Sequence, residues 1–230
     1  MQTMHTHKSD GPNQLRRKLF RGASGGVGVL LAVQAKTALG GGICQSPSAM
    51  MSGNTSPRPG GPPPCSGGRS PGFWKVPQKF NYWTGATPAT FAVTVDICRS
   101  GMQGLSMSDI LTEGTPLLSS IFPGSPSSHG LWAVLAFPTH ADFGGQGQLL
   151  RHLSAAYLNS TYPSWSSPYP ITTDQVKDMW VQLTSCGLYN PTVSSGCATT
   201  GMTASEVIAY ISGMYDIAAD LPPDADLCKP

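Results

Sequence analysis

The sequence predicts a mainly α-helical fold with a little β-structure: a small, disulfide-stapled domain with long irregular loops. Two observations carry this prediction. Three segments in the second half of the chain repeat apolar residues at helical spacing, and two of them begin with a capping box. All six cysteines lie beyond residue 40 (Cys44, Cys65, Cys98, Cys186, Cys197 and Cys228).

Residues 1–40 predict an export signal peptide. Arg16 and Arg17 precede an apolar run, residues 22–33, that is too short and too rich in glycine to span a bilayer. Small residues place the expected cleavage after Gly40. The segment resembles a twin-arginine signal, although Leu15 stands where such signals usually have a polar residue, so a Sec signal stays open. We expect export to the periplasm, cell surface or medium, with the export machinery as one partner and no stable membrane span.

Removing the signal changes the charge of the chain. The full sequence carries a formal net charge of +2, but six of its 14 Lys and Arg residues and only one of its 12 acidic residues lie in residues 1–40. The remainder therefore has 8 basic and 11 acidic residues, or about −3. The basic character belongs to the signal and gives no argument for a nucleic-acid partner.

The even number of cysteines in an exported chain predicts three disulfides. We expect Cys44 with Cys65 and Cys186 with Cys197, because each pair closes a loop of small, turn-forming residues; Cys98 would then pair with Cys228. A C-x-x-C motif is absent and the histidines have no ligand spacing, so we expect neither a structural zinc ion nor another cofactor.

The chain after the signal divides into a linker and a domain. Residues 41–71 are dominated by Ser, Pro and Gly and predict an extended linker. The helix-rich domain is predicted over residues 72–230, where aromatic residues become dense and Trp74, Trp83 and Trp180 are expected in the core.

The elements of this domain follow in chain order. Residues 91–95 predict a short strand, and Ser108 is expected to cap a brief helix. Apolar spacing predicts a helix over residues 149–157. A second helix is expected from Thr172 or Thr173 to Gly187, and a third opens at the capping box of Thr203 and Glu206. In this third helix we expect Val207, Ile208, Ile211 and Tyr215 to be buried.

Two of these segments together carry a resemblance. Ser70-Pro71-Gly72-Phe73-Trp74-Lys75, followed by the helix ending in Leu158-Asn159 and then Tyr162-Pro163, is similar to exported bacterial domains that open with a Thr-Pro-Gly-Tyr-Trp-Lys-Asn-His motif. Val76-Pro77 replaces the Asn-His of that motif, so no role of those polar residues is carried over. The resemblance implies export and a shared fold, and it implies no reaction.

Catalytic motifs are weak in this chain. Gly68-Arg69-Ser70-Pro71-Gly72 matches the G-x-S-x-G pattern of a hydrolase nucleophile elbow, but Pro71 lacks the N–H group that the oxyanion hole needs. A linker turn is the favoured interpretation. A hydrolase would instead need a serine beside His129, His140 or His152, with Asp142 as the acid.

A binding role has slightly more support. Tyr162, Trp165 and Tyr169 lie in a proline-stiffened loop between two helices, where their rings could stack on a sugar or anchor a protein. The alternative is that they fold back over the helices. Three hypotheses follow: a non-catalytic envelope or secreted protein acting in structure, assembly or adhesion; a carbohydrate- or protein-binding module; and a hydrolase of unrecognised type.

Overall fold

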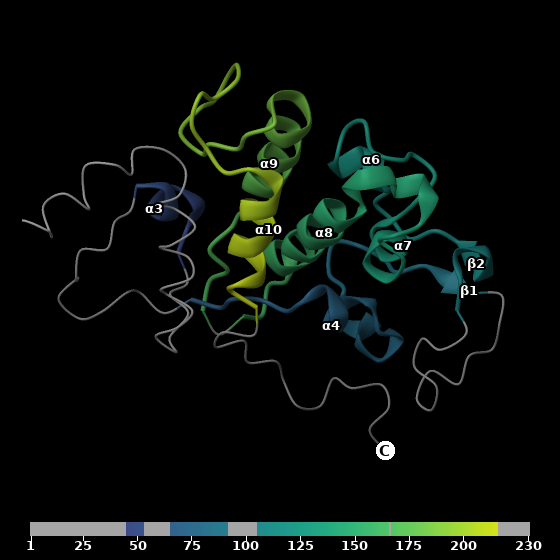
Figure 1. Ribbon diagram of the computed structural model, residues 1–230. Helices are drawn as coiled ribbons and strands as arrows, with labels where there is room; N and C mark the ends of the chain where they lie inside the picture. The colour runs from purple at the N-terminus through teal and green to yellow at the C-terminus, as the bar shows by residue number, and fades with distance from the viewer. Residues whose placement is uncertain (1–44, 53–64, 92–104, 166, 216–230) are drawn as a thin grey trace, which may run out of the picture.

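A single long helix, α8, forms the centre of the fold (Figure 1). The computed structural model describes residues 45–52, 65–91, 105–165 and 167–215. Helices α4, α7, α9 and α10 and the 3₁₀ helix η3 all pack against α8 or against one another. The helices are α3 (Pro47–Met51), α4 (Pro71–Lys75), α6 (Leu118–Ile121), α7 (Leu131–Ala136), α8 (Gly147–Thr161), α9 (Thr173–Cys186) and α10 (Ala204–Ser212), and the 3₁₀ helices are η1 (Pro77–Tyr82), η2 (Met107–Asp109) and η3 (Ala141–Gln146).

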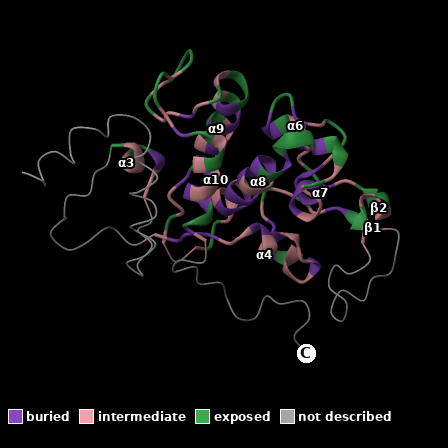
Figure 2. Ribbon diagram, in the orientation of Figure 1, coloured by how far each residue is buried: buried purple, intermediate pink, exposed green. Residues whose placement is uncertain are grey.

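Burial explains why α8 is central. Leu150, Leu153 and Ala156 are fully buried, at the spacing that places them on one helical face, and Ala155 is fully buried beside them. Figure 2 shows the buried residues gathered on α8, on α7 and on the inner sides of α9 and α10, whereas the loop beyond α9 is exposed. The expected core tryptophans, Trp74, Trp83 and Trp180, are all buried.

The predicted fold class is confirmed, and the three predicted helices are α8, α9 and α10. In α9 the Gln175 amide donates to Thr172 Oγ1 at 3.2 Å, the Thr172 amide donates to Gln175 Oε1 at 3.0 Å, and Gly187 ends the helix with a φ of 78°. Thr203 and Glu206 form the same reciprocal cap on α10.

Three details differ from the sequence-based expectations. Ser106, not Ser108, caps the short turn, because the Asp109 carboxylate accepts both the amide and the hydroxyl of Ser106. The residues that follow form β2 (Ile110–Thr112), which pairs antiparallel with β1 (Thr90–Phe91). Val207 and Ile211 are buried as expected, whereas Ile208 and Tyr215 are only half-buried. Residues 92–95 of the predicted strand lie outside the described residues.

The N-terminal side of the domain is tied to α8 by the side chain of Asn159. Its Oδ1 accepts the Arg69 amide at 2.8 Å and the Trp74 indole N–H at 3.0 Å, and its Nδ2 donates to the Arg69 carbonyl at 2.9 Å. Gly68 passes so close, at a φ of 71°, that a Cβ there would overlap the Asn159 amide. Two segments far apart in the sequence, residues 69–74 and the C-terminal part of α8, therefore meet in one buried hydrogen-bond cluster.

Part of the range expected as linker packs on the domain. The Ser66 amide donates to the Pro168 carbonyl at 3.1 Å, and Ser66 is fully buried. Further towards the N-terminus, α3 follows Gln45, whose carbonyl accepts the Tyr210 hydroxyl. Packed structure therefore begins before Gly72. Signal residues Arg16, Arg17 and Gly40 lie outside the described residues.

The expected disulfide between Cys186 and Cys197 is present. Cys65 is also disulfide-bonded, while Cys44, Cys98 and Cys228 lie outside the described residues. None of the described helices combines the length and the apolar character that crossing a membrane requires.

Candidate functional site

The three aromatic residues singled out in the sequence come together around one cavity, which we call the aromatic pocket. It has a volume of about 440 Å³, within the range of small-molecule sites. Tyr162, Trp165 and Tyr169 are each half-buried, so their rings are neither fully exposed nor sealed in the core. The pocket is lined by Asn159, Ser160, Tyr162, Pro163, Trp165, Ser167, Pro168, Tyr169, Ile171, Thr172 and Thr173.

The orientation of the Trp165 ring is fixed by contacts with α8. Its indole N–H donates to the Asn159 carbonyl at 2.8 Å, and its centroid lies 4.8 Å from that of Tyr162 in an edge-on arrangement. Tyr162 in turn packs against Trp74 and Tyr82, with centroids 6.4 and 6.1 Å away. A ring held in this way loses little further freedom when a ligand binds.

The described residues of the aromatic pocket carry no charge. They contribute hydroxyl, amide, proline, aromatic and aliphatic side chains, and none of them is Asp, Glu, Lys, Arg or His. Burial raises the pKa of the Tyr169 hydroxyl far above its usual value, so this group stays neutral. The pocket therefore offers ring faces and neutral hydrogen-bonding groups to a ligand.

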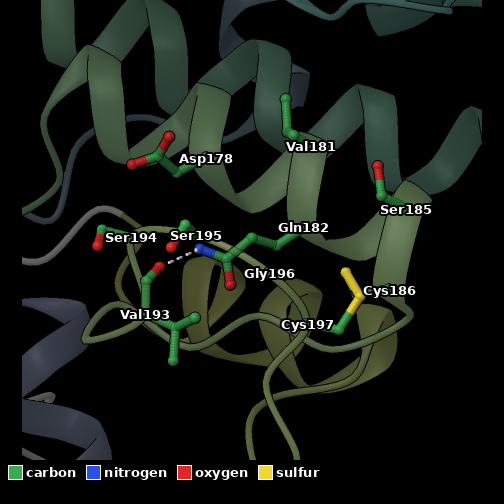
Figure 3. Close-up of a pocket in the computed structure, with 10 residues that line it drawn as sticks. All are labelled: Asp178, Val181, Gln182, Ser185, Cys186, Val193, Ser194, Ser195, Gly196 and Cys197. Carbon is green, nitrogen blue, oxygen red and sulfur yellow. Dashed lines mark hydrogen bonds between the residues drawn. A yellow bond between two sulfur atoms is a disulfide. The ribbon is translucent and has the colours of Figure 1, made fainter.

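A second cavity, which we call the disulfide pocket, lies between α9 and the loop closed by Cys186 and Cys197 (Figure 3). Its volume is about 320 Å³. In Figure 3, Asp178 on α9 and Ser194 and Ser195 on the loop lie at one end, and the disulfide lies at the other. The lining residues are Asp178, Val181, Gln182, Ser185, Cys186, Val193, Ser194, Ser195, Gly196 and Cys197.

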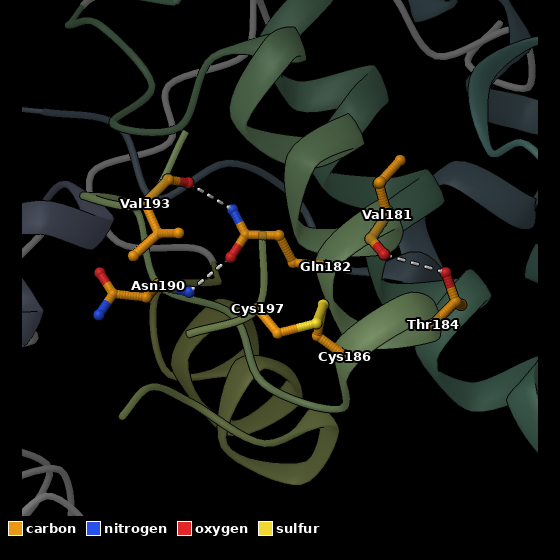
Figure 4. Close-up of a disulfide and its surroundings, with 7 residues drawn as sticks. All are labelled: Val181, Gln182, Thr184, Cys186, Asn190, Val193 and Cys197. Carbon is orange, nitrogen blue, oxygen red and sulfur yellow. Dashed lines mark hydrogen bonds between the residues drawn. A yellow bond between two sulfur atoms is a disulfide. The ribbon is translucent and has the colours of Figure 1, made fainter. Parts of the chain in front are cut away.

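The loop that forms this pocket is clamped to α9 by Gln182 (Figure 4). Its Nε2 donates to the Val193 carbonyl at 3.2 Å, and its Oε1 accepts the Asn190 amide at 2.9 Å. Tyr189 and Met202 then exchange two backbone hydrogen bonds of 2.8 Å across the base of the loop. The loop is thus held by a disulfide, a side-chain clamp and a backbone bridge.

His129 is bound by a carboxylate on each side of its ring. Glu113 Oε1 lies 2.8 Å from Nδ1, and Asp142 Oδ2 lies 2.8 Å from Nε2. Glu113 also accepts the amide of Gly130, which caps α7, at 2.9 Å. Burial lowers the pKa of His129, but the hydrogen bonds that its ring donates to Glu113 and Asp142, together with their negative charges, outweigh burial and raise the pKa overall. The ring therefore joins three segments of chain.

The other two described histidines also have structural partners. His140 Nδ1 accepts the Asp142 amide at 3.4 Å, and His152 Nδ1 lies 2.9 Å from the Tyr215 hydroxyl. Burial, with a smaller effect of the Arg151 charge, lowers the pKa of His152 to about 4, so its neutral ring can accept that hydroxyl. Within the described ranges no Ser, Thr or Cys side chain hydrogen-bonds to any of these rings. The hydrolase hypothesis gains no support here.

Two sequence motifs have structural roles. Ser70 precedes α4 as its N-cap, with Pro71 at the first helical position, and the preceding segment is not a strand. Ser70 therefore begins a short helix that packs on the domain, and it does not lie on the strand-to-helix turn of a nucleophile elbow. Asn159-Ser160-Thr161 fits the glycan acceptor pattern, but Asn159 is fully buried with its amide hydrogen-bonded.

Comparison with protein-family models, with curated proteins and with solved structures gives no match for this chain. Among the side chains that the structure describes, no group of three or more His, Cys, Asp or Glu is arranged to hold a metal ion.

The sequence grouped Tyr162, Trp165 and Tyr169 on one loop but predicted no cavity there, and it missed the disulfide pocket. The expected disulfide was its only signal, because the serines of residues 194–195 follow no motif and Gln182 is one polar residue on a helix. Only folding brings Gln182 against a loop that begins eight residues later.

Proposed function

We propose that the protein is an exported, non-catalytic binding protein whose aromatic pocket takes a neutral glycan. The observation that carries this proposal is the uncharged cavity lined by Tyr162, Trp165 and Tyr169. Sugars bind through stacking of their apolar ring faces on aromatic rings and through hydrogen bonds to hydroxyl and amide groups, and both kinds of group line the pocket. The resemblance of the chain to exported domains and its predicted signal supply the export half.

The neutral character of the described lining residues favours some glycans over others. An acidic sugar would lose the water around its carboxylate, and none of the described lining residues is cationic to compensate. A neutral sugar has only hydroxyl or amide groups to satisfy, and Ser160, Ser167, Thr172 and Thr173 are available around the cavity. The volume of about 440 Å³ suits one or two sugar units.

Binding is tested by calorimetric titration of the exported, signal-free chain with neutral cello- and chito-oligosaccharides. Trp165→Ala should weaken binding about tenfold or more. A tenfold loss of affinity corresponds to about 1.4 kcal/mol of binding free energy, which one stacked aromatic ring can contribute. Trp165→Phe is the matched control: it keeps a ring but loses the hydrogen bond to Asn159, so it should retain most of the affinity. An oligogalacturonate serves as the anionic comparison.

The proposal fails if no neutral oligosaccharide binds at millimolar concentration, or if Trp165→Ala leaves the affinity unchanged while circular dichroism confirms that the variant is folded. Preference for the oligogalacturonate would contradict the assignment of a neutral ligand.

The prediction that the chain is exported is tested separately. Replacement of Arg16 and Arg17 by lysine should leave precursor in the cytoplasm of a bacterial host. Unimpaired export of this variant would exclude the twin-arginine route, and failure of the unaltered chain to leave the cytoplasm would exclude export in that host.

A further inference from the structure

Among the described residues that line the disulfide pocket, one is charged: Asp178. Asp178 is exposed, and among the described residues it has neither a hydrogen bond nor an ion pair. Its negative charge is nonetheless felt inside the fold, because it adds to burial in raising the pKa of the Tyr189 hydroxyl. A carboxylate in this position attracts a cation into the cavity.

Two hydroxyl residues accompany this carboxylate. Figure 3 places Ser194 and Ser195 on the loop at the same end of the pocket as Asp178. A primary ammonium group has three N–H donors and no acceptor, so one carboxylate and two hydroxyl oxygens match its hydrogen-bonding capacity. A guanidinium group is planar and prefers a bidentate carboxylate with further acceptors in the same plane, which three groups on two separate segments do not provide.

The rest of the pocket is suited to a short alkyl chain. Val181 is 44% exposed, which is unusual among the large hydrophobic residues of this fold, and Val193 is half-buried on the opposite loop. Both valines line the cavity, with Val193 at the Asp178 end and Val181 on α9 between that end and the disulfide, which forms a weakly polar wall (Figure 3). A methylene chain lying here would cover Val181 while its ammonium group stays at the mouth.

The loop that forms the pocket is held in place by contacts within the fold. Gln182 holds the loop through the Val193 carbonyl and the Asn190 amide, and the disulfide closes the other end (Figure 4). A ligand therefore does not have to order this loop, which lowers the entropic cost of binding.

We propose that the disulfide pocket binds a primary ammonium group carried on an alkyl chain, such as a lysine side chain of a partner protein or a free alkylamine. The Asp178 carboxylate pairs with the ammonium group, and the hydroxyl oxygens of Ser194 and Ser195 accept hydrogen bonds from its other N–H groups. Val181 and Val193 contact the methylene groups. This site is separate from the aromatic pocket, so it does not depend on the proposed glycan ligand.

The test uses the signal-free chain and two-dimensional amide NMR, which detects weak binding residue by residue. Nα-acetyl-lysine methylamide should shift the amide signals of residues 193–196 and the side-chain amide of Gln182. The Nε-acetylated form of the same probe, which has no positive charge, should not. Butylamine distinguishes the sources: equal binding indicates that the alkylamine suffices, and stronger binding of the lysine probe indicates a protein partner.

Asp178→Asn should weaken binding about fivefold, which is the upper end of the contribution that a single exposed ion pair makes. Raising the salt concentration from 0.15 to about 1 M should also weaken binding of the unaltered chain, because salt screens the ion pair. Asp174→Asn is the matched control, because Asp174 is an exposed acid on the same helix that does not line the pocket. The proposal is overturned if the lysine probe shifts no signal of residues 193–196, if Asp178→Asn binds as tightly as the unaltered chain, or if the Nε-acetylated probe binds equally well.

Discussion

Replacing Asn159 by alanine should be among the most costly single changes in the domain. The side chain is fully buried and makes three hydrogen bonds, to the Arg69 amide, the Trp74 indole and the Arg69 carbonyl. Alanine leaves these groups without their partner in a site that water reaches poorly, and each buried unsatisfied group costs about 1–3 kcal/mol. We therefore expect the free energy of unfolding to fall by about 3–5 kcal/mol. This is a large share of the total stability of a typical domain, which is about 5–15 kcal/mol.

Urea denaturation followed by circular dichroism measures this loss, and a double-mutant cycle tests its cause. Trp74→Phe removes one donor, so the effects of Asn159→Ala and Trp74→Phe should fall short of additivity by about 1 kcal/mol. Ser160→Ala, the next position on α8, removes only a hydroxyl that donates to the Tyr157 carbonyl and should cost no more than about 1 kcal/mol. A loss below about 1 kcal/mol for Asn159→Ala, or full additivity with Trp74→Phe, would refute the assignment of Asn159 as the tie between the two segments.

Three further predictions concern single features of the fold. The pKa of His129 is raised in the folded state above its ordinary value of 6.5. The stability that it contributes is therefore present below pH 6.5 and is lost as the pH rises through the raised value. The free energy of unfolding should fall by about 1 kcal/mol or less between pH 6 and pH 8, because Asp142 is half-exposed, and His129→Gln should remove this dependence. Gly187→Ala should lower stability by about 1 kcal/mol, because alanine must adopt a φ of 78° at the end of α9 although no atom crowds the site; an unchanged urea midpoint would contradict this. Replacing Cys186 and Cys197 by serine should lower the free energy of unfolding by about 3 kcal/mol, because the disulfide no longer restricts the conformations of the unfolded chain. A midpoint of thermal unfolding no lower than that of the unaltered protein would contradict this.

The helices that could be predicted are the long amphipathic ones with local start signals. Thr172 with Gln175 and Thr203 with Glu206 are only three residues apart, so the interactions that begin α9 and α10 are visible in the sequence itself. Helix α7 could not be found in this way. Its six residues are apolar, and the first five are buried, so no alternation between a polar and an apolar face marks it.

The candidate sites also differ in how far the sequence could predict them. Tyr162, Trp165 and Tyr169 lie on one loop, so their grouping was visible in the sequence, although their half-buried state depends on contacts with Asn159 and Trp74 from elsewhere. The disulfide pocket depends on packing of α9 against a loop, and the His129 cluster depends on His129 meeting both η3 and the segment around residue 113. Such pairings are set by tertiary packing, for which a single sequence carries no local signal.

Helix α9 contributes to both proposed pockets, and its geometry keeps them independent. Thr173, at its start, lines the aromatic pocket, and Asp178, five residues later, lines the disulfide pocket. At 1.5 Å and 100° per residue these positions are about 7.5 Å apart along the axis and about 140° apart around it. The buried residues Val176, Met179 and Leu183 hold the helix in place between them. We therefore expect Trp165→Ala to leave binding of the lysine probe unchanged and Asp178→Asn to leave glycan binding unchanged. A variant that lost both would have lost the packing of α9, so measuring both ligands on each variant separates damage to a site from damage to the fold.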